Sequence, residues 1–456
     1  MKLVKSLLLG TAAGIAAVAG AQAADLPSRK AAPVEYVRVC TAYGAGFFYI
    51  PGTDSCLRIS GRVRAEYAVG QRYSDFQDAY GTRARGRLNV DVRTATAYGT
   101  LRTFIRYELT NNSGIYSSGT GLYNPGATIP GIARGPSSTT TGSLVDLAFV
   151  QFGPITAGRA QSFFDFYAND LGFASVRTSD TRLNLLAYTA TFGSGFSATV
   201  SAEDRTSGTL GRENGGVTYL GLAGTGTAIT QGQDYPDLIA SLRVDQGWGS
   251  AQLSGAIGQR KYAVANTIGA IDGDEIAWAI QGGVKINLPM LAAGDALWLQ
   301  AAYADGALGY LGWGPGSLGL GRIGRLTLAD AAINPVTGNV DTSTGWSVVA
   351  AFRHFWTPTL RTELFGSYSE VKLGYVDNVS LAGFAPRSLD PKELLVAANL
   401  IWSPVSGLDI GVEVLYSHLD LRSQVGTVDN AGARSGILGI KSEDSVSGRL
   451  RIQRDF

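Results

Sequence analysis

The sequence lacks a long uninterrupted apolar run after its N-terminus, which limits the ways in which the chain could cross a membrane. A transmembrane helix needs about 20 predominantly apolar residues. Beyond residue 23 no segment offers such a stretch. The sequence therefore predicts no membrane-spanning helix in the remainder of the chain.

Lysine and histidine are also scarce. Of the 38 basic residues 30 are arginine, and there are only two histidines. The formal net charge is +1, whereas nucleic-acid-binding domains carry a net basic surface. No cluster of nucleophile and base is visible. We therefore expect no enzymatic activity, no cofactor and no nucleic-acid partner.

The acidic run 272–275 could hold calcium, but we interpret it as a solvated turn and expect no metal site.

The first 23 residues have the features of a secretory signal peptide. Lys2 and Lys5 precede an apolar stretch at 7–18, and Ala21-Gln22-Ala23 supplies the small residues of a cleavage site. The apolar stretch is shorter than a membrane-spanning helix. We therefore expect an exported protein whose mature chain covers residues 24–456.

Cysteine is nearly absent as well. The only two, Cys40 and Cys56, lie in the segment 24–56. In an exported protein a lone pair of cysteines most simply forms a disulfide. Metal binding by two cysteines without a nearby histidine is the less favoured alternative. We expect residues 24–56 to form a periplasmic N-terminal extension that contains this disulfide.

What the chain does have is arginine at alternate residues of three consecutive segments between 57 and 110. In the first segment Arg62 and Arg64 alternate with Val63 and other apolar or small residues. A period of two indicates a strand and sends the two sets of side chains to opposite faces. The economical arrangement is a barrel in which apolar residues face lipid and arginines line water.

The same period recurs along the chain and predicts sixteen strands, joined alternately by short turns and long loops. This layout is typical of outer-membrane barrels. The last strand ends on Phe456, a pattern that the barrel-assembly machinery recognises. We therefore expect an all-β, 16-stranded antiparallel transmembrane β-barrel with Phe456 as its assembly signal. The expected strands are 57–67, 82–96, 100–110, 143–153, 155–160, 183–192, 195–203, 235–247, 248–258, 275–287, 295–305, 345–356, 358–370, 392–402, 406–417 and 446–456.

Residues 34–61, VEYVRVCTAYGAGFFYIPGTDSCLRISG, resemble the N-terminal signature of the alphaproteobacterial porins. The resemblance continues through GRAQSFFD at 158–165 and reaches Phe456. It implies a homotrimeric barrel in the lipids of the cell outer membrane, with a passive diffusion pore for small hydrophilic solutes and ions. It also implies that the third long loop, here 161–182, folds into the lumen and narrows it.

This constriction loop carries carboxylates among several aromatic residues. We expect the aromatics to anchor the loop to the inner wall and the carboxylates to face the opening. Aligning the first three strands by height brings four arginines together on the opposite wall. Opposed charges of this kind bias ion passage and orient dipolar solutes. The expected constriction residues are Asp165, Asp170 and Asp180 on the loop and Arg62, Arg85, Arg87 and Arg106 on the wall.

Other interpretations remain open at this point. Asp91, Glu66 and Glu108 could neutralise the arginines in structural networks, and the loop 161–182 could be an ordinary solvated loop. A substrate-specific channel would use the same barrel with a binding site in its constriction. An adhesin or surface receptor would instead use the variable loops, without transport.

Overall fold

The computed structural model describes residues 38–71, 78–118, 139–207, 217–220, 226–228, 232–266, 269–313, 328–333, 340–374, 390–426 and 439–456. The chain divides into two compact units, 1–56 and 57–456. The expected signal peptide, 1–23, lies outside the described residues. So does the first part of the expected extension 24–56.

The described part of the first unit is small and closed by a disulfide. Cys40 is bonded to Cys56, which confirms the expected pairing. Both cysteines are buried together with Phe47. The unit also contains η2 (Thr41–Tyr43) and β1 (Phe48–Tyr49).

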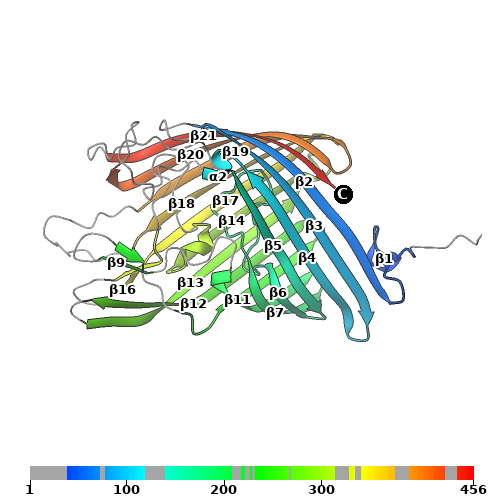
Figure 1. Ribbon diagram of the computed structural model, residues 1–456, viewed down its shortest axis with the longest axis horizontal. Helices are drawn as coiled ribbons and strands as arrows, with labels where there is room; N and C mark the ends of the chain where they lie inside the picture. The colour runs from blue at the N-terminus through cyan, green and yellow to red at the C-terminus, as the bar shows by residue number, and fades with distance from the viewer. Residues whose placement is uncertain are drawn as a thin grey trace, which may run out of the picture. The chain divides into compact units, whose positions relative to one another are not determined.

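The second unit is a closed antiparallel barrel of sixteen strands, as expected (Figure 1). The last strand pairs with the first, placing Arg62 opposite Asp455 and Gly70 opposite Ser447. Closure satisfies the backbone groups of both terminal strands, as a spanning structure in lipid requires. The strands are β2 (Ser55–Gly70), β3 (Tyr80–Thr96), β4 (Gly99–Asn112), β5 (Thr140–Phe152), β6 (Ile155–Gln161), β7 (Arg182–Gly193), β8 (Phe196–Glu203), β11 (Asp237–Gln246), β12 (Gly249–Asn266), β13 (Gly269–Asn287), β14 (Ala296–Asp305), β17 (Thr344–Thr357), β18 (Leu360–Lys372), β19 (Lys392–Val405), β20 (Leu408–Gly426) and β21 (Gly439–Asp455).

Several strands are longer than their sequence pattern indicates. β12 and β13 remain paired as far as Asn266 and Gly269. Residues 259–266 and 269–274, which the expected strands 248–258 and 275–287 leave as a long loop, are therefore parts of these two strands. The acidic run 272–275 therefore lies within β13 and not in a solvated turn. The apolar alternation fades here, but the backbone of one strand still pairs with its neighbour, because sheet pairing does not require apolar side chains.

Burial alternates along the strands and separates the two faces of the wall. On β14 the side chains of Trp298, Gln300, Ala302 and Ala304 are buried, whereas Leu299 and Tyr303, which alternate with them, are exposed. The buried set faces the interior, and the exposed apolar set faces lipid. Within the ranges described above, no helix has the length and apolarity needed to cross a membrane.

Two segments between strands fold into the barrel interior. The first, 162–181, joins β6 to β7 and corresponds to the expected constriction loop. The second, 306–313, follows β14 and includes η4 (Leu308–Leu311). The remaining short elements are α2 (Ile115–Ser118), η3 (Arg205–Ser207) and a separate sheet of β9 (Val217–Leu220), β10 (Gly226–Ala228), β15 (Ala331–Ile333) and β16 (Val340–Thr342).

Candidate functional site

The constriction loop, residues 162–181, is fixed by polar side chains that point inward from successive strands. At its start the backbone N–H of Phe163 donates to Glu203 Oε1 on β8 (3.0 Å). Gln281 Nε2 on β13 donates to the carbonyl oxygen of Phe164 (2.9 Å). The inner wall thus satisfies the backbone groups of a non-helical segment in the barrel interior.

The tip of the loop is held by two buried glutamates. The N–H of Gly172 donates to Glu363 Oε2 on β18 (3.1 Å). The N–H groups of Phe173 and Ala174 donate to the two carboxylate oxygens of Glu413 on β20, at 2.5 and 2.7 Å. A buried backbone N–H without an acceptor is costly, so these three hydrogen bonds fix the tip on the two glutamates.

Sequence reasoning missed these anchoring residues. Glu203, Glu363 and Glu413 occupy inward positions of strands and are buried. The available signal was an isolated glutamate in a strand, because a buried carboxylate needs donors from elsewhere in the fold. Which donors they would be depended on the path of the loop, which the sequence does not show.

The loop aromatics lie against the wall and each other. Phe164 and Tyr167 are fully buried, and the Tyr167 ring meets Trp298 of β14 edge-on at 6.4 Å. Phe173 near the tip lies under the guanidinium of Arg451, with 4.0 Å from Cζ to the ring centroid. These contacts place apolar rings between the loop backbone and the barrel.

A cavity of about 540 Å³ lies between the loop tip and the basic wall. Its lining contains all four arginines that the strand alignment brought together, and two of the three loop carboxylates. Ten arginines and six carboxylates line it in total. They are Arg62, Arg64, Arg83, Arg85, Arg87, Arg106, Arg182, Arg353, Arg361 and Arg451, with Glu108, Asp146, Asp170, Asp180, Glu363 and Asp409.

The third loop carboxylate has a different place. Asp165 is buried and accepts hydrogen bonds from the backbone N–H of Thr181 (2.7 Å) and from the Gln161 side chain. It joins the two ends of the loop and is not part of the cavity lining. The expectation that all three carboxylates face the opening therefore fails at Asp165, because a buried carboxylate at the loop base is satisfied by local donors.

Carboxylates on the wall partly compensate the arginines. Glu108 lies 2.5 Å from Arg87 and 3.4 Å from Arg85, and Arg106 lies 3.4 Å from Asp146. Neutralisation by structural pairs thus describes part of the wall. The excess of arginine in the lining leaves it net positive.

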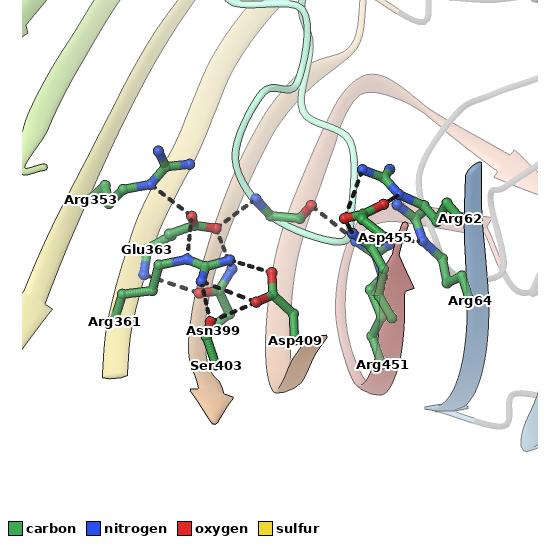
Figure 2. Close-up of polar contacts among 12 residues, drawn as sticks. Arg62, Arg64, Arg353, Arg361, Glu363, Asn399, Ser403, Asp409, Arg451 and Asp455 are labelled. Atoms are coloured by element: carbon green, nitrogen blue, oxygen red, sulfur yellow. Dashed lines mark hydrogen bonds and ion pairs between the residues drawn. The ribbon is translucent and has the colours of Figure 1, made fainter. Parts of the chain in front are cut away.

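The basic lining extends beyond the first three strands. Figure 2 shows Arg62, Arg64 and Arg451 on one side of the loop, with Arg353 and Arg361 on the other. Closure of the barrel places β21 beside β2 and so brings Arg451 into the group. The alternating arginines of the last strand were a usable signal. Arg353 on β17 and Arg361 on β18 could not be assigned to this group from the sequence, because the whole barrel sets their height relative to the loop.

Asp170 is a loop residue with an altered acidity. Its side chain is exposed to the lumen, but the surrounding protein displaces bulk water and raises its pKa to about 6. Repulsion by the carboxylate of Asp180 adds to this shift. Asp170 therefore changes charge close to neutral pH, beside the cavity.

Known proteins resemble the chain in sequence and in fold. The family described as porin subfamily matches residues 25–449. Porin Omp2b of Brucella canis and of Brucella abortus are each 34% identical over 314 residues, which cover 67% of this chain and 75% of theirs. The outer membrane channel DcaP of Acinetobacter baumannii shares the fold, with a TM-score of 0.60 and 16% identity, over 90% of this chain and 99% of that one. The chain therefore belongs to the porin subfamily and is a passive diffusion porin of the outer membrane.

Proposed function

We propose that the cavity beside the constriction loop is the selectivity filter of this porin and favours anions among the small hydrophilic solutes and ions that pass. The observation that carries the proposal is the lining itself, with ten arginines and six carboxylates around about 540 Å³. Arginine keeps its charge in every environment. A pore lined by an excess of fixed positive charge concentrates anions and repels cations.

The arrangement of the charges also supports an orienting role. Asp170 and Asp180 lie on the loop, whereas Arg62, Arg87 and Arg106 lie on the wall strands. Opposed charges across a narrow passage make a transverse field. Such a field aligns a dipolar solute and disfavours an apolar one, without a conformational cycle or an energy source.

Reversal potentials in a salt gradient test the proposal. Replacing Arg62, Arg87 and Arg106 together by glutamine removes three positive charges from the lining, so we expect the potential to shift toward cation preference. Arg454→Gln is the matched control, because Arg454 is exposed and lies outside the cavity lining. An unchanged potential in the folded triple variant would refute the charge-selective role.

We infer further that three copies assemble in the membrane. The outward face of β2 to β4 combines exposed apolar side chains such as Val63, Leu88 and Ile105 with the small exposed residue Gly86. An exposed apolar surface of this kind can pack against another barrel as well as against lipid. The mass of the detergent-solubilised complex tests this inference, and a monomer alone would contradict it.

We also infer how the protein reaches and enters the outer membrane. We infer export by the cleavable signal peptide 1–23 and recognition of Phe456 by the barrel-assembly machinery. Phe456 is exposed at the end of the closing strand, which supports an accessible recognition residue. The N-terminal sequence of the purified protein tests the cleavage, with Ala24 as the expected first residue.

A further inference from the structure

The inner segment, residues 306–313, lies inside the barrel, although the expected strands 295–305 and 345–356 leave 306–344 as one long loop between them. Leu308, Tyr310, Leu311 and Trp313 have at most 1% of their surface exposed. Burial of large apolar side chains is the main stabilising contribution in a folded protein. The inner segment is therefore a packed element of the barrel interior.

Small inward side chains on three strands make room for this segment. Ala256 on β12, Ala277 and Ala279 on β13, and Ala302 and Ala304 on β14 are all buried in one cluster with it. A larger residue at these positions would occupy the space that Tyr310 and Trp313 fill. The repeated alanines are thus complementary in volume to the inner segment.

A buried polar network fixes the position of the inner segment. Tyr310 Oη donates to Asp237 Oδ2 on β11 (2.8 Å), and Asp237 Oδ1 lies 3.3 Å from Arg205 Nη1. Asp330 accepts from the N–H of Leu308 (2.9 Å) and from Arg260 Nε (3.3 Å). The charged side chains are at most 2% exposed. Buried charges are costly unless paired, so displacing the segment would break a set of mutually dependent contacts.

The inner segment contacts the constriction loop directly. The rings of Phe164 and Tyr310 meet edge-on, with centroids 4.6 Å apart. Arg177 of the loop places its guanidinium 3.7 Å from the centroid of the Trp313 ring and donates from Nη1 to the Gly312 carbonyl oxygen (3.1 Å).

Arg177 also reaches the barrel wall. Its Nε donates to Glu393 on β19, and its backbone N–H donates to Ser367 on β18 (2.9 Å). Arg177 therefore joins three parts of the fold: the constriction loop, the inner segment and the wall. These contacts account for the presence of a buried arginine on this loop.

The backbone at Gly312 is adapted to this close approach. Its φ is +78°, in the left-handed region that favours glycine. A Cβ at this position would lie 2.5 Å from the backbone nitrogen of Thr178 in the constriction loop. The two segments are thus in backbone contact.

We propose that the inner segment is a second positioning element of the pore, which holds the constriction loop in place through Arg177 and Trp313 and so sets the size limit for solutes. The proposal rests on the proposed function, in which the constriction loop borders the selectivity filter. It adds that the loop is held both by the strands and by the inner segment. Arg177 and Trp313 are positioning residues, since neither lines the cavity.

The test uses Arg177→Gln and Trp313→Leu in the full-length porin. Heat-modifiable gel mobility reports folding, and single-channel current fluctuations report loop movement. Liposome swelling with neutral sugars of increasing size reports the size limit. Losing a desolvated cation–π contact should lower the ratio of anchored to displaced loop by about thirtyfold. We expect larger fluctuations and faster uptake of the larger sugars. Trp346→Leu is the matched control, because Trp346 faces outward on β17 and is 37% exposed.

Conservative variants keep the test decisive if the first pair does not fold. Arg177→Lys keeps the charge without the planar guanidinium, and Trp313→Phe keeps a ring without the hydrogen bond from Nε1 to Ser369. We expect intermediate fluctuations in both. Wild-type fluctuations and sugar uptake in the folded variants would overturn the proposal. Neutral sugars carry no net charge, so their uptake does not report the anion or cation preference that the reversal potentials measure, and the two tests can fail independently.

Discussion

At the scale of single residues, Asp170 is a loop side chain whose charge responds to pH near neutrality. It lies on the constriction loop beside the cavity, and its pKa is raised to about 6 by loss of surrounding water and by Asp180. Below this value the carboxyl group is neutral and the lining is more positive. Above it the loop gains one negative charge, which opposes the excess of arginine.

The anion preference should therefore fall as the pH rises from about 5 to about 7, one unit on either side of this pKa. Asp170→Asn should abolish this pH-dependent step in ion selectivity and keep the stronger anion preference of low pH across the whole range. Asp180→Asn should move the step to lower pH, because it removes the repulsion that disfavours ionisation. Reversal potentials across this range measure all three. The histidines His354 and His418 lie outside the cavity lining, so a step that persists in Asp170→Asn would contradict the assignment.

At the scale of elements, the constriction loop is stabilised by groups on strands that are distant in sequence. Glu413 on β20 receives two backbone N–H groups of the tip, and Glu363 on β18 receives a third. The barrel wall thus acts as a series of acceptors for a segment that has no regular secondary structure of its own. The position of the tip depends on carboxylates more than 190 residues away along the chain.

Replacing Glu413 by alanine should displace the tip, because the N–H groups of Phe173 and Ala174 lose their acceptor. An unsatisfied buried donor costs about 1–3 kcal/mol. We expect a lower unfolding temperature and faster uptake of large neutral sugars into liposomes. Glu413→Gln should have a smaller effect, since it keeps one acceptor oxygen.

Glu370→Ala provides the control for this prediction. Glu370 pairs with Lys392 (3.1 Å) and with the Tyr368 hydroxyl, away from the constriction loop. Its removal should leave sugar uptake unchanged. Equal uptake by Glu413→Ala and wild type would show that the glutamate does not hold the tip.

At the scale of the whole barrel, the pairing of β21 with β2 closes the sheet (Figure 1). We call this junction of the last and first strands the seam. Phe456 completes the seam, because its backbone exchanges hydrogen bonds with Gly61 at 2.9 and 3.0 Å. Its ring also lies over Gly61. A Cβ on Gly61 would stand 2.5 Å from a ring atom of Phe456 and 2.6 Å from the carbonyl oxygen of Arg87. The glycine therefore permits the terminal aromatic to pack on the seam.

Gly61→Val should reduce the yield of folded barrel, since the seam would have to shift to accommodate the side chain. Gly86→Val is the matched control, because a Cβ on Gly86 of β3 meets no atom within 4 Å. The fraction of heat-modifiable protein recovered from outer membranes measures both. Equal recovery of the two variants would refute the role assigned to Gly61.

The sequence by itself determined the barrel, because a two-residue period with arginine on one face and apolar residues on the other has few stable solutions. It also indicated the disulfide between Cys40 and Cys56, since no other cysteine is present. The grouping of Arg62, Arg85, Arg87 and Arg106 was accessible because neighbouring antiparallel strands can be aligned by height.

Only the tertiary structure decided how the interior is filled. Asp165 turned inward to the loop base, Arg451 joined the basic wall across the seam, and the segment 306–313 packed inside instead of outside. Each of these depends on contacts between residues far apart in sequence. A local pattern specifies which face of a strand points inward. It does not specify which loop packs against that face, because the loop must match the volume and the charge of the interior of the closed barrel.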